Sequence, residues 1–328
     1  MRRSERTNMN QIEDEFVYPV DIGTWQSYQP YSDPQQIREQ LDNLVHTGLF
    51  NGLGEITFIY TKQLKRYHDY LETISNDIHI VNTETVLEDE IYYTSKIEGA
   101  KTTRVRTTEI HNGSPVKKDN EYSELMIKNA FDAVKLLNLY GNKVSKESLK
   151  HVWRVLTEGC RDNQEIMGDN YRSGDVYAGD FEAASFKLVP ELMDKWIDFY
   201  NNAKFDSMPF IKASLLHYAF ETIHPYCDGN GRLGRLMLNN YLIGRGIETA
   251  RAVSISMEID KRRTVYDASF TQSENKYNDC TPFLNYFMET ISASYNRAYE
   301  LQNSINNTRE SESDSAEDSV SVRRISHR

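Results

Sequence analysis

The segment HPYCDGNGRLGR, residues 224–235, decides how the fold and function of this chain are understood. It starts with a His-Pro step, continues through an acid and two glycines around an asparagine, and ends with two arginines three residues apart. A proline disfavours helical geometry in the residue before it, so the apolar helix predicted over residues 207–224 ends at His224. A new helix is predicted to begin within or just after the GNG turn.

The loop between these two helices carries groups that bind phosphate. Glycine and asparagine tolerate positive φ, so the backbone N–H groups of Gly229, Asn230 and Gly231 can turn inward around an anion. The N-terminus of the following helix adds unpaired N–H donors and the positive end of its dipole. Arg232 and Arg235 lie on one face of the first turn of that helix. The segment therefore predicts a phosphate cradle.

Two side chains at the start of the segment predict the chemistry. Asp228 suits Mg²⁺, which commonly binds one carboxylate together with substrate phosphates. His224 can take a proton from an incoming hydroxyl group. Taken singly, a buried histidine, a DGNG turn and a pair of helix arginines are more often structural. Their order in one helix–loop–helix junction is what predicts transfer of a phosphate-containing group.

The segment resembles the signature of the Fic family, H-x-F-x-[DE]-G-N-G-R-x-x-R, and departs from it only at Tyr226, where phenylalanine is usual. The resemblance extends from about residue 120 to about residue 290. It includes GDNYRSGDVYA, which is similar to the stretch that leads into the family's β-hairpin flap. It also includes DKRRTVYDASF and DCTPFLNYF, which are similar to the helices that close the fold.

The resemblance implies a protein adenylyltransferase that moves AMP from ATP to a hydroxyl side chain of a target protein, or of itself, and releases pyrophosphate. In such an enzyme His224 would be the general base and Asp228 would hold Mg²⁺. The glycines and the asparagine of the GNG turn would line the anion hole, and Arg232 and Arg235 would contact the triphosphate. The second glycine, Gly231, favours nucleotidyl transfer over the kinase chemistry of a related branch with lysine there.

Three other functions stay open at this point. The same site could remove AMP from a target, or it could transfer a nucleotide other than AMP. The chain could also be a nucleotide-binding regulator with little turnover, although an intact His224 and Asp228 argue against this. The target protein and any homo-oligomer cannot be identified from the sequence.

A second motif, TSKIEGA, resembles the inhibitory motif of Fic proteins, [ST]-x-x-x-E-[GN], through Thr94, Glu98 and Gly99. It precedes the predicted core, which is the class II arrangement. Thr94 and Glu98 are four residues apart at the end of a predicted helix, where a carboxylate opposes the helix dipole unless a cation lies nearby. The resemblance implies that this cation is Arg235, and that the pair keeps the arginine from ATP.

The pattern along the whole chain predicts an all-α fold with one small β-hairpin. Helices are predicted over residues 37–50, 56–74, 84–99, 123–140, 145–159, 190–203, 207–224 and 232–246. The Gly- and Asp-rich region 162–188 predicts a loop with a hairpin flap at about 176–187. We expect three parts: an N-terminal helical region (1–118) that carries the inhibitory helix (about 84–99), a catalytic core (119–300), and a charged, Ser-rich disordered tail (301–328).

Composition limits the class of protein. The formal net charge of −11 argues against a broad nucleic-acid-binding surface. No apolar run approaches the length of a membrane span, and the basic start of the chain lacks the apolar segment of a secretory signal. Cys160, Cys227 and Cys280 are too few for a disulfide framework or a zinc site. We therefore expect a cytoplasmic protein.

Overall fold

The computed structural model describes residues 42–79, 83–162, 167–168, 170–178, 181–274 and 278–325, with backbone alone for residues 307–325. Residues 37–41, where a helix was predicted to begin, lie outside the described residues.

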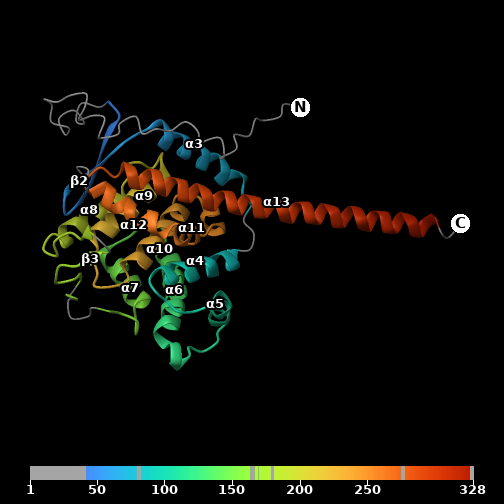
Figure 1. Ribbon diagram of the computed structural model, residues 1–328, viewed down its shortest axis with the longest axis horizontal. Coiled ribbons are helices and arrows are strands. Elements are labelled where there is room, and N and C mark those ends of the chain that lie inside the picture. The colour runs from blue at the N-terminus through green and yellow to red at the C-terminus, as the bar shows by residue number, and fades with distance from the viewer. Residues whose placement is uncertain are drawn as a thin grey trace.

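The described chain is mostly helical, as predicted, and it contains two small antiparallel sheets (Figure 1). The longer helices are α3 (Lys62–Asp77), α4 (Thr83–Ile97), α5 (Arg104–His111), α6 (Glu121–Tyr140), α7 (Lys146–Leu156), α8 (Val189–Asn201), α9 (Pro209–Ile223), α10 (Asn230–Gly244), α11 (Ile255–Lys261), α12 (Arg263–Glu274) and α13 (Thr281–Ile325). Short 3₁₀ turns η2 (Lys118–Asn120) and η4 (Glu248–Ala252) join some of them. The strands are β1 (Leu44–Asn51), β2 (Gly54–Ile59), β3 (Tyr177–Ala178) and β4 (Phe181–Glu182).

Local sequence signals explain where several helices begin and end. Ser145 forms a capping box with Ser148 at the start of α7, which satisfies free N–H groups of the first turn. Gly141, at φ +69, follows the last residue of α6, and Gly99, at φ +89, follows the end of α4. The helix α9 ends before His224, as the following proline predicts.

The hairpin β1–β2 corrects the prediction of helices over residues 37–50 and 56–74. Its strands pair Leu44 with Ile59 and Asn51 with Gly54, and only from Lys62 onward is the second prediction right. Gly54 has φ +126, a conformation that suits glycine in a tight turn. From Thr47 onward every second residue of β1 is buried, which is the period of a strand. The helical spacing of apolar residues was therefore misleading here.

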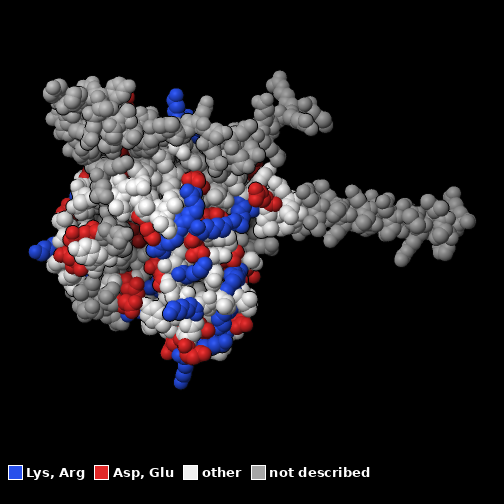
Figure 2. All heavy atoms as spheres, viewed as in Figure 1, with Lys and Arg blue, Asp and Glu red and all other residues white. Residues whose placement is uncertain are grey.

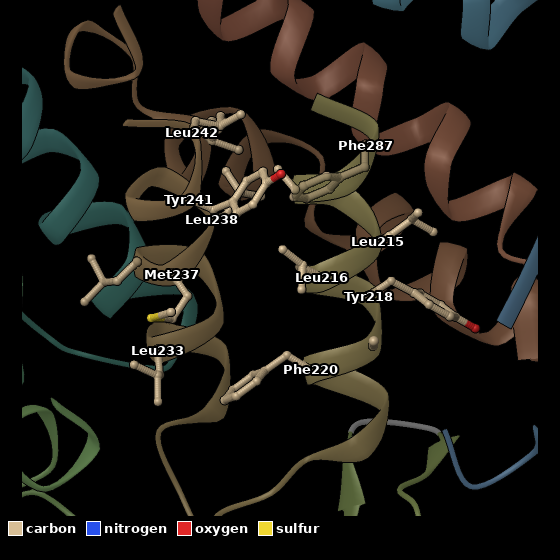
Figure 3. Close-up of a cluster of buried hydrophobic side chains, with 14 of the residues drawn as sticks. Leu215, Leu216, Tyr218, Phe220, Leu233, Met237, Leu238, Tyr241, Leu242 and Phe287 are labelled. Atoms are coloured by element: carbon tan, nitrogen blue, oxygen red, sulfur yellow. The ribbon is translucent and has the colours of Figure 1, made fainter. Parts of the chain in front are cut away.

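The core is centred on α9, whose residues from Phe210 to Ile223 are all buried. Figure 3 shows buried side chains of α9 and α10, with Leu216 and Phe220 on the side of α9 that faces α10 and Leu215 and Tyr218 on the other side. Burying a large apolar side chain contributes roughly 1.5–3 kcal/mol, so this pair of helices is a strongly stabilised part of the fold. The segment between α9 and α10 is thus carried by a rigid support.

The helix α13 runs to Ile325 and its last part projects away from the body of the molecule (Figure 1). The tail over residues 301–328 was expected to be disordered, and this expectation stays a prediction; the described backbone is helical as far as Ile325. Residues 301–325 contain neither glycine nor proline, so nothing in them breaks the helix that the core begins. The proposed division at residues 118 and 300 stays a prediction.

Charges of both signs are interspersed on the surface. Figure 2 shows a strip of Lys and Arg over the middle of the face in view, with Asp and Glu close to it. Among the exposed cations of the described chain, Lys96 pairs with Asp260 at 2.7 Å and Arg263 with Asp267 at 2.8 Å. Within the described residues, no helix is both long and apolar enough to cross a membrane.

Candidate active site

His224 lies at the C-terminus of α9 in a left-handed conformation, with φ 52° and ψ 62°. Its ring Nδ1 lies 3.3 Å from the carbonyl oxygen of Glu221. Since a carbonyl only accepts hydrogen bonds, this contact places the proton of the neutral ring on Nδ1 and leaves Nε2 free to accept one. Burial lowers the pKa of His224 to about 4. The ring is therefore neutral at pH 7, the form that a general base requires.

Asp228 lies in the loop between α9 and α10, with its side chain partly exposed. One carboxylate oxygen accepts from the backbone N–H of Gly229 at 2.6 Å. The other accepts from the N–H of Asp162 at 3.1 Å and lies 3.3 Å from Arg232 Nη2. The indole N–H of Trp153 donates to the Asp228 carbonyl at 2.8 Å, which fixes the loop backbone from α7. These contacts hold the partly exposed Asp228 carboxylate in a fixed position in the loop.

The GNG turn forms the start of α10. Gly229 is its N-cap with φ +79, and a side chain there would collide with Thr157. The Asn230 side chain accepts from the N–H of Tyr226 and donates to its carbonyl, both at 2.9 Å. The Asn230 amide therefore closes the loop, and its contribution to an anion hole is limited to its backbone. Gly231 follows inside the first turn, where helix N–H groups have no helical acceptor.

Tyr226, the departure from the Fic signature, is buried and stacks on Trp153 with ring centroids 4.6 Å apart. Its hydroxyl has no hydrogen-bond partner among the described residues. A phenylalanine would make the same ring contact without burying a hydroxyl, so the tyrosine does not change the shape of the loop.

Arg232 and Arg235 are both almost fully buried, yet they have different partners. Arg232 contacts Asp228 within its own loop and donates to the thiol sulfur of Cys160 at 3.7 Å. Arg235 instead reaches α4: its Nη2 lies 2.6 Å from Glu98 Oε1, and its Nε donates to the Thr94 hydroxyl at 2.8 Å. The predicted contact between Glu98 and Arg235 is therefore present.

The Glu98 carboxylate occupies the space over the first turn of α10. A Cβ atom on Gly231 would lie 2.3 Å from Glu98 Oε1, so the carboxylate rests directly against that glycine. Burial alone would raise the pKa of Glu98, but Arg235, Arg232 and Arg263 more than offset it and hold that pKa below its usual value. Glu98 is thus a charged anion at a helix N-terminus, where a phosphate would also be favoured.

The rest of α4 is fixed by acidic side chains along its length. Glu90 is buried and accepts from Ser254 and from the backbone N–H of Ser256 at the start of α11. Glu88 is held by Arg104 at 2.8 Å, and by two further side chains of α5, Thr108 and His111. These contacts set the position of the α4 terminus that carries Glu98.

The second hairpin, β3–β4, lies where the flap was predicted. Tyr177 pairs with Glu182 and Ala178 with Phe181. Shortly after β4, the N–H of Ala184 donates to the carbonyl of Thr222 at 3.1 Å, so the base of the hairpin is bonded to the end of α9.

The structure adds residues that the sequence did not single out. Arg172 donates to the carbonyl of His224 at 2.7 Å, and Arg263 donates to the carbonyl of Ile97 at the end of α4 at 3.0 Å. Glu221 is buried one turn before His224, and burial raises its pKa to about 8. A pattern search for catalytic groups overlooks arginines that bond backbone carbonyls, because the carbonyls have no sequence signature.

The sequence of residues 143–242 matches the Fic/DOC family. The match to this family is confined to that part of the chain. This range includes α7, the hairpin β3–β4, α9 and most of α10, and therefore His224, Asp228, Arg232 and Arg235. Glu98 and α4 precede the matched range.

Curated relatives of this chain include protein adenylyltransferase fic-1 of Caenorhabditis briggsae, which is 24% identical over 254 residues, covering 74% of this chain and 48% of that protein. The fic-1 protein of Caenorhabditis elegans is 23% identical over a similar share. The chain thus spans about half the length of these relatives.

Solved structures show the same fold. A Fic family protein from Desulfovibrio desulfuricans G20 has a TM-score of 0.66 at 21% identity, covering 75% of this chain and 76% of that one. The E274G form of C. elegans Fic-1, residues 134–508, has a TM-score of 0.57 at 20% identity, with 74% and 72% covered. The protein has the mostly helical Fic fold.

Proposed function

We propose that this Fic-domain chain is a protein adenylyltransferase that transfers AMP from ATP to a hydroxyl group of a target protein and that α4 inhibits it. The observation that carries the proposal is the junction of α9 and α10. It combines a neutral histidine at the end of one helix with two buried arginines at the start of the next, and the curated relatives above are named protein adenylyltransferases.

In the proposed reaction Nε2 of His224 takes the proton of the attacking hydroxyl group. The hydroxyl oxygen then bonds to the α-phosphorus of ATP, and the bond from that phosphorus to pyrophosphate breaks. The N-terminal turn of α10 and the two arginines would bind the negative charge of the triphosphate. Because these donors are held by the fold, the charge needs little reorganisation of the protein.

The residues present fit a magnesium ion at Asp228. Among the described residues, no group of three or more His, Cys, Asp or Glu side chains could hold a metal ion by itself. Asp228 offers a single, partly exposed carboxylate, which suits a cation that takes its other ligands from phosphates and water. When bound, Mg²⁺ would stabilise negative charge on the phosphates and the leaving pyrophosphate.

Inhibition would come from the position of Glu98. Its carboxylate holds Arg235 and lies against Gly231, so it occupies a place where an anionic phosphate of ATP is expected to bind. Release of the α4 terminus would free both the arginine and the N-terminal turn of α10. The class II arrangement and the inhibitory role of Thr94, Glu98 and Gly99 are parts of this proposal.

Radiolabelled ATP provides the test. The full chain is incubated with ATP labelled on the α-phosphate and with cell extract as a source of targets, as wild type and as Glu98→Gly. We expect Glu98→Gly to incorporate AMP into the extract proteins, or into itself, about 100-fold faster than wild type, because a freed arginine lets the α-phosphate settle in line with the hydroxyl. Excess EDTA should abolish the incorporation.

The controls separate the parts of the proposal. α-Labelled GTP, UTP and CTP test transfer of another nucleotide, and pre-modified extract incubated with the wild type tests AMP removal. If Glu98→Gly is folded and binds ATP but incorporates no label from any nucleotide, the chain is not a nucleotidyltransferase. If both proteins incorporate AMP at the same rate, the inhibitory role of α4 is wrong.

A further inference from the structure

Arg172 is an arginine whose side chain is completely buried beneath the end of α9. Its guanidinium donates to four backbone carbonyls. Nε donates to His224 at 2.7 Å, Nη1 to Gly174 at 2.6 Å, and Nη2 both to Ile223 at 3.2 Å and to Ala184. Its own backbone N–H donates to the carbonyl of Pro225 at 2.9 Å. One residue thus bonds two segments that are separated along the chain.

The four carbonyls belong to two functional regions. Those of Ile223 and His224 end α9, where the last carbonyls of a helix have no helical donor. Those of Gly174 and Ala184 flank the hairpin β3–β4 on both sides. Arg172 therefore caps α9 and, with the same planar group, fixes the base of the hairpin against it.

We propose that Arg172 is a positioning residue, which holds the backbone of His224 and the base of the β3–β4 hairpin in a single arrangement and so aligns the base with the substrate hydroxyl. The proposal rests on the proposed function for the role of His224. The geometry itself does not depend on it.

Two features argue that Arg172 is more than packing. A buried cation is costly unless it is paired, but the nearest described carboxylate, Asp175, lies 3.8 Å away and itself accepts from the N–H of Phe186. The buried charge thus has one long ion pair and depends mainly on the four carbonyls, which an apolar side chain could not bind. His224 is also left-handed, which costs a residue with a side chain roughly 1–2 kcal/mol, so its carbonyl needs a firm partner.

The charge of Arg172 acts on the imidazole as well. Burial is the main cause of the low pKa of His224, and the positive charge of Arg172 lowers it further, while the carbonyl of Glu221 and the charge of Glu98 raise it. Removal of the guanidinium should therefore raise the pKa of His224. A purely mechanical support would not have this effect.

The experiment compares Arg172→Met with Arg172→Lys in the full-length Glu98→Gly chain. A matched control is Arg245→Met, because Arg245 also donates to a carbonyl in the last turn of a helix, that of Tyr200 in α8 at 3.1 Å, but lies at the end of α10 opposite the loop. Each variant is assayed for AMP incorporation, and NMR follows the His224 imidazole titration, with His224→Ala identifying its signals. Thermal unfolding reports folding.

We expect Arg172→Met to lower kcat about 100-fold with KM for ATP changed less than about threefold, because misplacing a base affects turnover rather than nucleotide binding. Lysine keeps the charge but lacks the planar guanidinium group, so the kcat of Arg172→Lys should be about tenfold higher than that of Arg172→Met. The His224 titration should move to higher pH in Arg172→Met and stay in place in Arg172→Lys and Arg245→Met.

Two results would overturn the proposal. One is a folded Arg172→Met whose kcat stays within about twofold of its parent. The other is a parallel loss of kcat, KM and melting temperature in Arg172→Met and Arg245→Met, with the His224 titration unmoved, which would make Arg172 a structural residue only. If Arg172→Met does not fold, the test uses Arg172→Lys, whose kcat should fall while its KM for ATP stays nearly unchanged. The NMR result needs no turnover, so it tests the positioning even if the chain proves to transfer no AMP.

Discussion

Two helices end at this site, and an arginine from another element caps each of them. At the end of α9, Arg172 is fully buried and donates to four carbonyls of two segments. At the end of α4, Arg263 has a side chain that is 41% exposed and donates to one carbonyl, that of Ile97. Exposed bonds compete with water and contribute less than buried ones.

The end of α9 is therefore fixed by buried contacts, whereas the end of α4 is held by contacts that can break. The α9 terminus cannot move without breaking a buried network of hydrogen bonds, so His224, the proposed base, is held in one position. The α4 terminus makes contacts with three different elements, from Glu98 to α10, from Lys96 to α11 and from Ile97 to α12, and the side chains of Glu98, Lys96 and Arg263 are partly exposed, so water can compete for these contacts. We infer that catalysis and inhibition are located in parts of the fold with different local stability.

The largest effect on AMP incorporation should follow from a substitution at the end of α9. We expect His224→Ala, made in the Glu98→Gly chain, to lower AMP incorporation about 10²–10⁴-fold, the range of a general base. Affinity for ATP should stay the same, because the phosphates are bound by α10 and its arginines. Incorporation of labelled AMP and equilibrium binding of ATP are measured on the same samples. Unchanged incorporation would exclude His224 as the base.

The next prediction tests whether the end of α4 acts on ATP binding through Arg235. Arg235→Ala should not reproduce the activation expected for Glu98→Gly, because it removes the inhibitory contact and a phosphate ligand together. The double variant should be about 100-fold less active than Glu98→Gly alone. A double variant as active as Glu98→Gly would show that Arg235 has no part in holding ATP.

A smaller effect is expected from Arg263→Ala, which loosens the α4 terminus but leaves Glu98 in the chain. Loss of one hydrogen bond of about 1 kcal/mol should raise AMP incorporation roughly fivefold. Arg262→Ala is the matched control, since Arg262 pairs with Glu289 of α13. Equal rates for both variants would mean that the Ile97 contact does not hold α4 in place.

The smallest effect on turnover is expected from Glu221→Gln. Burial raises the pKa of Glu221 from 4.5 to about 8, so at pH 7 the carboxyl is mostly neutral and glutamine resembles it. As the pH rises from 4.5 to 8, the unfolded wild type releases this proton and the folded protein does not, so the folded state loses stability with rising pH. The melting temperature of Glu221→Gln relative to wild type should therefore increase by about 5 °C between pH 5 and pH 8. A difference that is constant with pH would contradict the raised pKa.

The helix–loop–helix junction could be predicted from sequence because its signals are local. Pro225 ends α9, the glycines start α10, and the spacing of Arg232 and Arg235 sets their common face. The contact between Glu98 and Arg235 spans 137 residues, and only the family resemblance made it predictable.

The errors and omissions have physical causes as well. Over a segment as short as β1, the spacing of apolar residues fits both a helix and a strand. The pairing of β1 with β2 also depends on a turn whose geometry is set by Gly54. Arg172 and Arg263 bind backbone carbonyls, which every residue has, so no residue type marks their partners.

The contact of Glu98 with Gly231 has a consequence for how the protein could change in evolution. A single methyl group at position 231 would push the tip of the glutamate aside, since the two would be 2.3 Å apart, but it would also narrow the space for a phosphate. A lineage that loses inhibition should therefore first substitute Glu98, which keeps turnover. Substitution of Gly231 would more readily follow the loss of the enzymatic activity itself.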